Sequence, residues 1–273
     1  MAYGITLRND IGTAVLSTEV FKGYEYHSTL TVGDRLWGYN GDTSTVSLTG
    51  ANESYGLQNC TERPIVFVSV SSMPSSPAYS DTKHMVCVTG IAASTTSGYD
   101  WEIYIQRGYD ELTSTSAPIS LIVFAPVSQT ANSTYGMRLR NSSGDVTFDS
   151  TRQMLMPKVA GAFTSAVSQD NIVYVDISSY GLSTPAFFCP NIYRYRSGAY
   201  GSGIYCVAYS SLMYGFLNSS DDFAIGLLRV GHQVDNNPNN YDQCSTTGYQ
   251  GAYWDTGAGV YSPYFLIDAD DYS

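Results

Sequence analysis

Polar and apolar residues alternate with a period of two along much of the chain. The pattern is present in residues 5–8, 101–106 and 146–149. Successive side chains of a β-strand point to opposite faces, so this alternation predicts half-buried antiparallel strands. The uninterrupted apolar runs 65–68 and 121–124 are typical of strands in the core of a sandwich. No segment combines the period and the propensity of a three-turn helix. The pattern predicts an all-β protein.

The chain also repeats itself. Residues 3–12 match residues 135–144 at an offset of 132, with Tyr, Gly, Leu, Arg, Asn and Gly at the same places. Further segments match in the same order: 64–67 with 185–188, 85–88 with 204–207, 100–107 with 222–229, and 121–125 with 266–269. Matches that keep their order along a chain indicate an internal repeat more strongly than one match alone.

The repeat predicts two tandem, internally duplicated antiparallel β-sandwich domains, residues 1–132 and residues 133–273. Both have the length of a single domain. Asn141–Gly144 reads as a hairpin turn in which the glycine supplies a positive φ. Cys87 and Cys206 fall in matched segments, and we expect both to be buried, reduced and structurally equivalent.

Charge and composition exclude several classes. The formal net charge is −11, from 13 Lys and Arg against 24 Asp and Glu. Nucleic-acid binding needs clustered cations, so we expect no nucleic-acid partner. No apolar run approaches the roughly 20 residues of a membrane span, so we expect no membrane insertion. The first residues lack a secretory signal, and five widely spaced cysteines favour neither a disulfide framework nor a metal site.

No catalytic motif stands out. Paired carboxylates of the kind that glycosidases use occur at Asp100 and Glu102, 110–111 and 221–222, but Asp100 precedes a predicted strand and suits a turn better. No nucleophile elbow and no phosphate-binding loop are present. We therefore predict no catalytic residues, no cofactor and no metal. The acidic residues 268–271 leave a Ca²⁺ site open as an alternative to a solvated terminus.

One segment departs from the repeat. Residues 231–262 form an insertion in the second half that is rich in Asn, Gly, Tyr and Asp. Long loops in compact domains are usually functional, and Tyr with Asn and Gly is the composition of recognition loops. A long connection without a function is the alternative. The predicted partner-binding residues are the aromatic Tyr241, Tyr249, Tyr253 and Trp254 and the acidic Asp235, Asp242 and Asp255.

Charge favours a cationic partner, or Ca²⁺, for this insertion. Arg229 is the last cation of the chain, and six carboxylates follow it. Residues 198–203 form a smaller glycine-rich stretch that we also expect to be a loop.

The segment Tyr135–Ser150 resembles the N-terminal signature of small tail proteins of tailed bacteriophages, which have Tyr-Gly, an alternating strand, Asn-x-x-Gly and then Phe-Asp. The first half carries the opening but has Leu16 and Ser17 in place of Phe148 and Asp149. The resemblance implies a structural protein of the virion, in the tail, the tail tip or associated with a fibre. It implies other tail subunits as partners, a homo-oligomer among the options, and synthesis in the host cytoplasm.

Two alternatives stay open. The first is a pair of carbohydrate-binding modules, in which Trp37, Trp101 or Trp254 would stack on sugar rings of a host-surface receptor. Trp101 matches Phe223 in the repeat, which favours a core position for it. The second is a glycan-degrading enzyme of the tail.

Overall fold

The structure is a computed structural model with side chains. It describes residues 6–8, 14–17, 23–32, 53–73, 84–107, 119–130, 135–164, 172–190, 194–201, 204–217, 222–235 and 262–272. The described elements are β-strands and two short 3-10 turns, η3 (Ser178–Tyr180) and η5 (Ala269–Asp271). The all-β class predicted from the alternation is confirmed.

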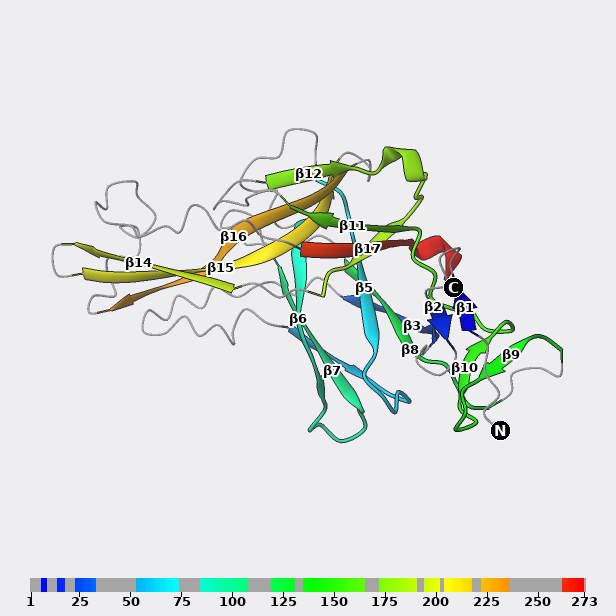
Figure 1. The fold of residues 1–273 in the computed structure, drawn as a ribbon. Helices are drawn as coiled ribbons and strands as arrows, with labels where there is room; N and C mark the ends of the chain where they lie inside the picture. The colour runs from blue at the N-terminus through cyan, green and yellow to red at the C-terminus, as the bar shows by residue number, and fades with distance from the viewer. Residues whose placement is uncertain are drawn as a thin grey trace.

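Two large antiparallel sheets contain most of the strands (Figure 1). Sheet I has the spatial order β11 (Val159–Phe163), β17 (Ser262–Asp268), β13 (Pro185–Phe188), β5 (Ile65–Val70), β8 (Ile119–Pro126) and β3 (Tyr24–Val32). Sheet II has the order β12 (Ile172–Asp176), β16 (Asp222–Asp235), β15 (Ile204–Leu217), β6 (Val86–Ala93), β7 (Trp101–Arg107) and β4 (Glu53–Leu57), and β14 (Arg194–Gly201) pairs with β15.

Two small hairpins complete the described strands. They are β1 (Thr6–Arg8) with β2 (Ala14–Ser17), and β9 (Arg138–Arg140) with β10 (Val146–Asp149). Leu7 pairs with Leu16 and Leu139 pairs with Phe148, so both strands of the second hairpin lie 132 residues after those of the first. In both hairpins the register shifts between this leucine and the next residue, which is Arg8 in the first and Arg140 in the second. The turn Asn141–Gly144 is present as predicted, with Gly144 at φ +90°.

Strands of both halves of the sequence share each large sheet. In sheet I, β3, β8 and β5 of the first half are followed by β13, β17 and β11 of the second. The halves meet where Val68 of β5 pairs with Phe187 of β13, and where Val86 of β6 pairs with Tyr214 of β15. The tandem arrangement predicted a sandwich for each half. In the structure the edge strands pair instead, because an edge presents unpaired N–H and C=O groups to any strand that fits.

The sequence match between Cys87 and Cys206 is wrong in register. Cys87 is buried, as expected, and pairs with Gln106 of β7. In the matched segments Gln106 corresponds to Leu228, which pairs with Ser211 of β15. Cys87 therefore corresponds to Ser211, and Cys206 lies five positions earlier in a longer strand.

Sheet I has a hydrophobic core on each of its faces. Val66, Val68 and Val70 of β5 belong to the main core, which also contains residues of sheet II. Phe67, between them, belongs to a second core on the opposite face. Tyr272, after the last strand, closes this second core, with its ring centroid 4.8 Å from that of Phe124.

The second half also covers the edge of sheet I formed by β3. The N–H of Tyr26 donates to the carbonyl of Gln153, and the N–H of Leu155 donates to the carbonyl of Tyr24, both at 2.7 Å. Glu25 and Met154 form an antiparallel bridge between these bonds. The segment that leads into β11 thus pairs with the free edge of the first half.

Candidate interaction site

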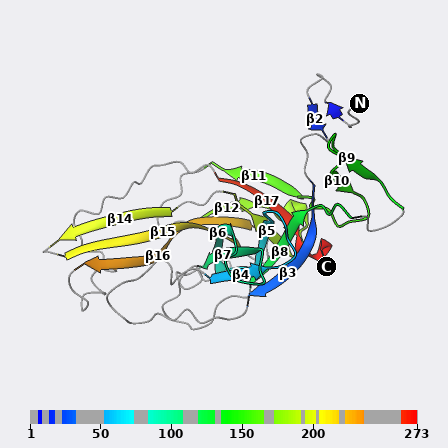
Figure 2. The ribbon, with the colours of Figure 1, turned by 90° about the horizontal axis from the view of Figure 1, so that it is seen from below.

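The predicted contact segment follows a three-stranded arm. β15 and β16 have 14 residues each, whereas β6 and β7, which pair in the same way in the first half, have 8 and 7. β14 lies on the other side of β15 and pairs with its first eight residues. Figures 1 and 2 show β14, β15 and β16 projecting together from the body, away from the C-terminus.

The first five residues of the predicted insertion, 231–235, form the outer end of β16 and not a loop. Tyr205 of β15 is opposite Tyr200 of β14 on one side and opposite Asp235 of β16 on the other. Asp235 is therefore the predicted site residue that the structure places, at the end of β16. The other six lie outside the described residues: Tyr241, Asp242, Tyr249, Tyr253, Trp254 and Asp255.

The glycine-rich stretch 198–203 was expected to be a loop. Residues 198–201 instead form the end of β14. Arg194, Tyr195 and Arg196 precede Gly198 in the same strand. The glycines gave the impression of a loop, because glycine is depleted in strands. The arm as a unit could not be read from the sequence, because β14 is specified by its pairing with β15.

The acidic C-terminal segment, residues 268–271, forms a turn that is closed by hydrogen bonds to the carboxylate of Asp268. Both oxygens of Asp268 accept backbone hydrogen bonds, from Ser183 at 2.8 Å, Thr184 at 3.0 Å and Asp270 at 3.3 Å. Burial raises the pKa of Asp268, but these N–H groups and the ammonium of Lys158 outweigh it, so the pKa lies below its usual value. The carboxylate therefore stays charged and serves as a cap for η5.

A cation from outside the segment compensates part of its charge. The Nζ atom of Lys158 lies 2.9 Å from Asp271 and 3.6 Å from Asp268. Two of the six carboxylates that follow Arg229 therefore have a counter-ion from an earlier part of the chain. The Ca²⁺ alternative loses one of its three carboxylates, because the oxygens of Asp268 already accept hydrogen bonds from N–H donors. The acidic residues that still favour a cationic partner are therefore those of the segment that follows the arm.

Two candidate catalytic carboxylates of the first half, Asp100 and Glu102, have structural partners, whereas residues 110–111 lie outside the described residues. Asp100 accepts a hydrogen bond from the N–H of Cys60 at 2.9 Å. Glu102 accepts hydrogen bonds from Ser94 and Thr96 at 2.9 Å and from Tyr104 at 2.5 Å. The Tyr104 hydroxyl is the largest influence that lowers the pKa of Glu102. Both side chains therefore hold the β6–β7 loop, the turn role expected for Asp100.

Trp101 packs into the fold as its match with Phe223 predicted. Its Nε1 donates to the carbonyl of Cys60 at 2.8 Å, and its half-buried ring contacts the main core. A sugar-stacking platform needs an exposed face. Trp37 and Trp254 lie outside the described residues.

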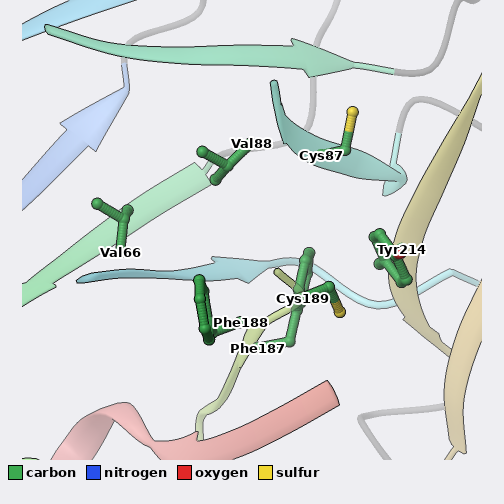
Figure 3. Close-up of a pocket in the computed structure, with 7 residues that line it drawn as sticks. All are labelled: Val66, Cys87, Val88, Phe187, Phe188, Cys189 and Tyr214. Atoms are coloured by element: carbon green, nitrogen blue, oxygen red, sulfur yellow. The ribbon is translucent and has the colours of Figure 1, made fainter. Parts of the chain in front are cut away.

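A small cavity lies where the two halves meet between the sheets. Figure 3 shows the residues that line it: Val66, Cys87, Val88, Phe187, Phe188, Cys189 and Tyr214. Its volume of about 10 Å³ is at the lower limit for one water molecule, far below that of a ligand site. Burial raises the pKa of the Cys189 thiol well above its usual value, so this thiol stays protonated and is a poor nucleophile.

Comparison with known proteins gives no match: no protein-family model, no curated protein and no solved structure matches the chain. Within the described ranges no helix is long and apolar enough to cross a membrane. In the same ranges no three His, Cys, Asp or Glu side chains gather as metal ligands. The basis for a function is therefore the architecture of the chain itself.

Proposed function

We propose that this protein is a structural component of a tailed-bacteriophage virion, in the tail or tail tip, and that it acts through protein–protein contacts. The observation that carries the proposal is the arm of the second half. Its strands are about twice as long as their counterparts in the first half, and the recognition-like insertion follows its outer end. Such an arm reaches a neighbour while the sandwich body keeps its own core.

The resemblance to small tail proteins supports the same function, and the structure explains why its motif has these residues. Gly136 has φ +129°, and a Cβ there would lie 2.5 Å from Thr151. The side chain of Asn141 accepts the N–H of Asp145 at 2.9 Å and closes the turn before Gly144. Asp149 accepts from Thr151 and is paired with Arg138. The motif thus specifies a rigid hairpin rather than a catalytic site.

The finer domain assignment is also a proposal. Residues 1–132 and 133–273 are two copies of one β-unit, joined edge to edge into shared sheets. The support is the common strand order in sheets I and II and the 132-residue offset of the two hairpins.

The experiment is a deletion of residues 236–257, with a short Gly-Ser link, in phage particles and in purified protein. We expect the purified variant to unfold at an unchanged temperature, because the first half lacks this segment and its strands still pair. Particles made with it should lack the protein or a neighbouring tail component. A matched control replaces the same residues by a Gly-Ser segment of equal length, which separates lost contacts from lost chain length.

Each other outcome of this deletion leads to a different conclusion. If particles assemble normally but no longer adsorb, the segment contacts a host-surface receptor and not a tail subunit. Receptor binding is the second candidate function. Particles that assemble and adsorb normally would overturn the proposal. Global unfolding of the purified variant would show that the segment belongs to the core.

A further inference from the structure

The hairpin of β1 and β2 repeats a hairpin that has a docking role inside the chain. Each hairpin carries one extra residue in its second strand, Val15 in the first and Thr147 in the second, where the ladder shifts register. The two residues occupy the same place of the 132-residue repeat. The extra residue of a β-bulge has no partner in its own ladder, so its backbone groups can bond elsewhere.

The second hairpin uses this bulge to dock on the end of the first half. The N–H of Gly23, immediately before β3, donates to the carbonyl of Thr147 at 3.0 Å. The side-chain amide of Gln129, which follows β8, accepts from the N–H of Val146 at 2.6 Å and donates to its carbonyl at 3.2 Å. On the hairpin side all of these groups belong to the main chain, so the bulge makes these bonds and not the side chains.

The first hairpin has the same main-chain groups at the same places. Ala14 corresponds to Val146 and Val15 to Thr147, and the ladder of β1 and β2 has the same bulge. Within the described strands no backbone hydrogen bond joins β1 or β2 to another element. The first hairpin can therefore form the contact that the second one forms, if an end of a β-sheet is there to receive it.

The end of the second half does not fit this hairpin. β11 pairs with β17 there as β3 pairs with β8 in the first half. Lys158 precedes β11 where Gly23 precedes β3, and its N–H already donates to the carbonyl of Leu266 at 2.8 Å. The position also requires glycine, because a Cβ at Gly23 would lie 2.3 Å from the carbonyl oxygen of Thr147.

The amide that holds the hairpin is missing from the second half as well. Asp271 follows β17 at the distance along the chain at which Gln129 follows β8. A carboxylate cannot donate to a carbonyl as an amide does, and that of Asp271 is paired with Lys158 at 2.9 Å. The described part of the chain thus has two hairpins of this kind and one end that fits them, and the second hairpin occupies that end.

We propose that the hairpin of β1 and β2 docks on the end of a β-sheet in a different subunit of the same particle. The partner that it fits has a glycine immediately before a strand, with its N–H free to donate to the carbonyl of Val15, and an amide side chain for the backbone of Ala14. Figures 1 and 2 show β1 and β2 beside β9 and β10, at the opposite end from the arm, so both contacts can form at once. The inference rests on the proposed function for its partner, a subunit of a virion, but it concerns a surface other than the arm.

The first test asks whether this hairpin can dock at all, and it uses the purified full chain. In a chimera, residues 3–17 replace residues 135–149, so that the first hairpin stands in the place of the second. We expect hydrogen exchange at the amide of Gly23 to stay within about threefold of the wild-type rate, because the bulge carbonyl is retained. The matched control is the same chimera without the residue taken from Val15, in which this amide should exchange at least about tenfold faster. Slow exchange in the strands of the main core shows that both chimeras are folded.

The second test identifies the partner in assembled particles. The photo-crosslinker p-benzoylphenylalanine replaces Thr13, which corresponds to the exposed Asp145 and therefore lies beside the contact and outside it. We expect one adduct with a different virion protein, mapped by mass spectrometry to the residues around a glycine that precedes a strand. The control carries the same probe at Tyr180, 51% exposed in η3, and should not form this adduct.

Three results overturn the inference. They are equally fast exchange of the Gly23 amide in both chimeras, an adduct of the Thr13 probe with its own chain or a second copy, and no adduct in particles that contain the protein. Particles that lack the chain altogether would contradict the proposed function instead, and the chimeras would still decide whether the hairpin docks.

Discussion

The hydroxyl of Tyr214 lies 2.7 Å from the hydroxyl of Ser262 inside the main core. Tyr214 belongs to β15 of sheet II and Ser262 to β17 of sheet I, so this buried hydrogen bond joins the two sheets. In the first half, Ile91 pairs with Ile103 as Tyr214 pairs with Ile225. At this place in the ladder, the polar Tyr214 of the second half stands where the first half has the aliphatic Ile91.

Replacing Tyr214 by Phe should destabilise the protein by about 1–2 kcal/mol, because it leaves the buried hydroxyl of Ser262 without this partner. Urea unfolding of the variant measures the loss. Adding Ser262→Ala should recover part of it, since both polar groups are then gone. Tyr174→Phe, at a hydroxyl-bearing ring 38% exposed in β12, is the control and should change little. If Tyr214→Phe leaves the free energy of unfolding unchanged, the hydrogen bond makes no net contribution to stability.

Glu25 gives the protein a defined pH dependence. Burial raises the pKa of Glu25 from its ordinary value of 4.5, although the guanidinium of Arg152, 3.3 Å away, acts in the opposite direction. A raised folded-state pKa means that the native state binds the proton more tightly than the unfolded chain does. The stability due to this group is therefore fully present below the unfolded pKa and is lost as pH rises through the folded pKa.

The Glu25→Gln variant removes that titration. Relative to the variant, the wild type should gain unfolding free energy as the pH falls from about 7 toward 4.5, the unfolded value. Urea unfolding of both proteins across this range gives the difference at each pH. A difference that stays flat, or that falls toward acid, would contradict the assignment of the raised pKa to Glu25.

Gly23 lies where the hairpin of β9 and β10 meets the first half, and its N–H donates to the carbonyl of Thr147. A Cβ at this position would lie 2.3 Å from the carbonyl oxygen of Thr147 and 2.6 Å from the terminal carbon of Met154. A backbone oxygen cannot move aside cheaply, so Gly23→Ala should cost about 1–3 kcal/mol. Gly90→Ala is the matched control, because its Cβ would meet nothing closer than Tyr104 at 3.7 Å.

Hydrogen exchange locates the effect of Gly23→Ala. Protection should fall first at the amides of Tyr26 and Leu155, which join residues 153–155 to β3. Equal loss of stability in the Gly23→Ala and Gly90→Ala proteins would show that the close approach at Gly23 is not the cause.

Three cysteines, Cys60, Cys87 and Cys189, should be unreactive in the native protein. Cys60 and Cys87 are buried, and burial raises the pKa of Cys60 and of Cys189. Native alkylation near pH 8 followed by peptide mass spectrometry should find these three thiols unlabelled, and labelling should become complete in urea. Rapid native labelling of Cys189 would show that the cavity opens to solvent.

Local features of the fold follow from the sequence because they depend on neighbouring residues. The alternation in residues 146–149 specifies β10, and Asn141 and Gly144 specify the turn before it. Residues 64–67 match residues 185–188 in sequence. The strands at these positions, β5 and β13, pair with each other in the structure. The match that assigned Cys87 to Cys206 fails, because the longer β15 displaces the register and a short apolar match cannot detect such a shift.

The candidate site, too, could be predicted from the sequence only in part. Composition located the insertion at residues 231–262, of which residues 231–235 belong to the end of β16. It gave no sign of the arm, because β14 depends on pairing with β15. The exposed Tyr135 belongs to the repeated motif, yet nothing in the motif distinguishes an exposed ring from a buried one. The counter-ion of Asp268 could not be found either, since Lys158 is distant in sequence.

By itself the sequence determined the all-β class, the matched segments and the hairpin turn, since hydrophobic period, turn residues and local identity act within about ten residues of chain. Only the tertiary structure decided that the two halves share their sheets. The choice between two separate sandwiches and two joined sheets depends on which edges meet, at Val68 with Phe187 and at Val86 with Tyr214. Backbone N–H and C=O groups form these pairs and are the same in almost every residue, so the side-chain pattern does not encode the choice.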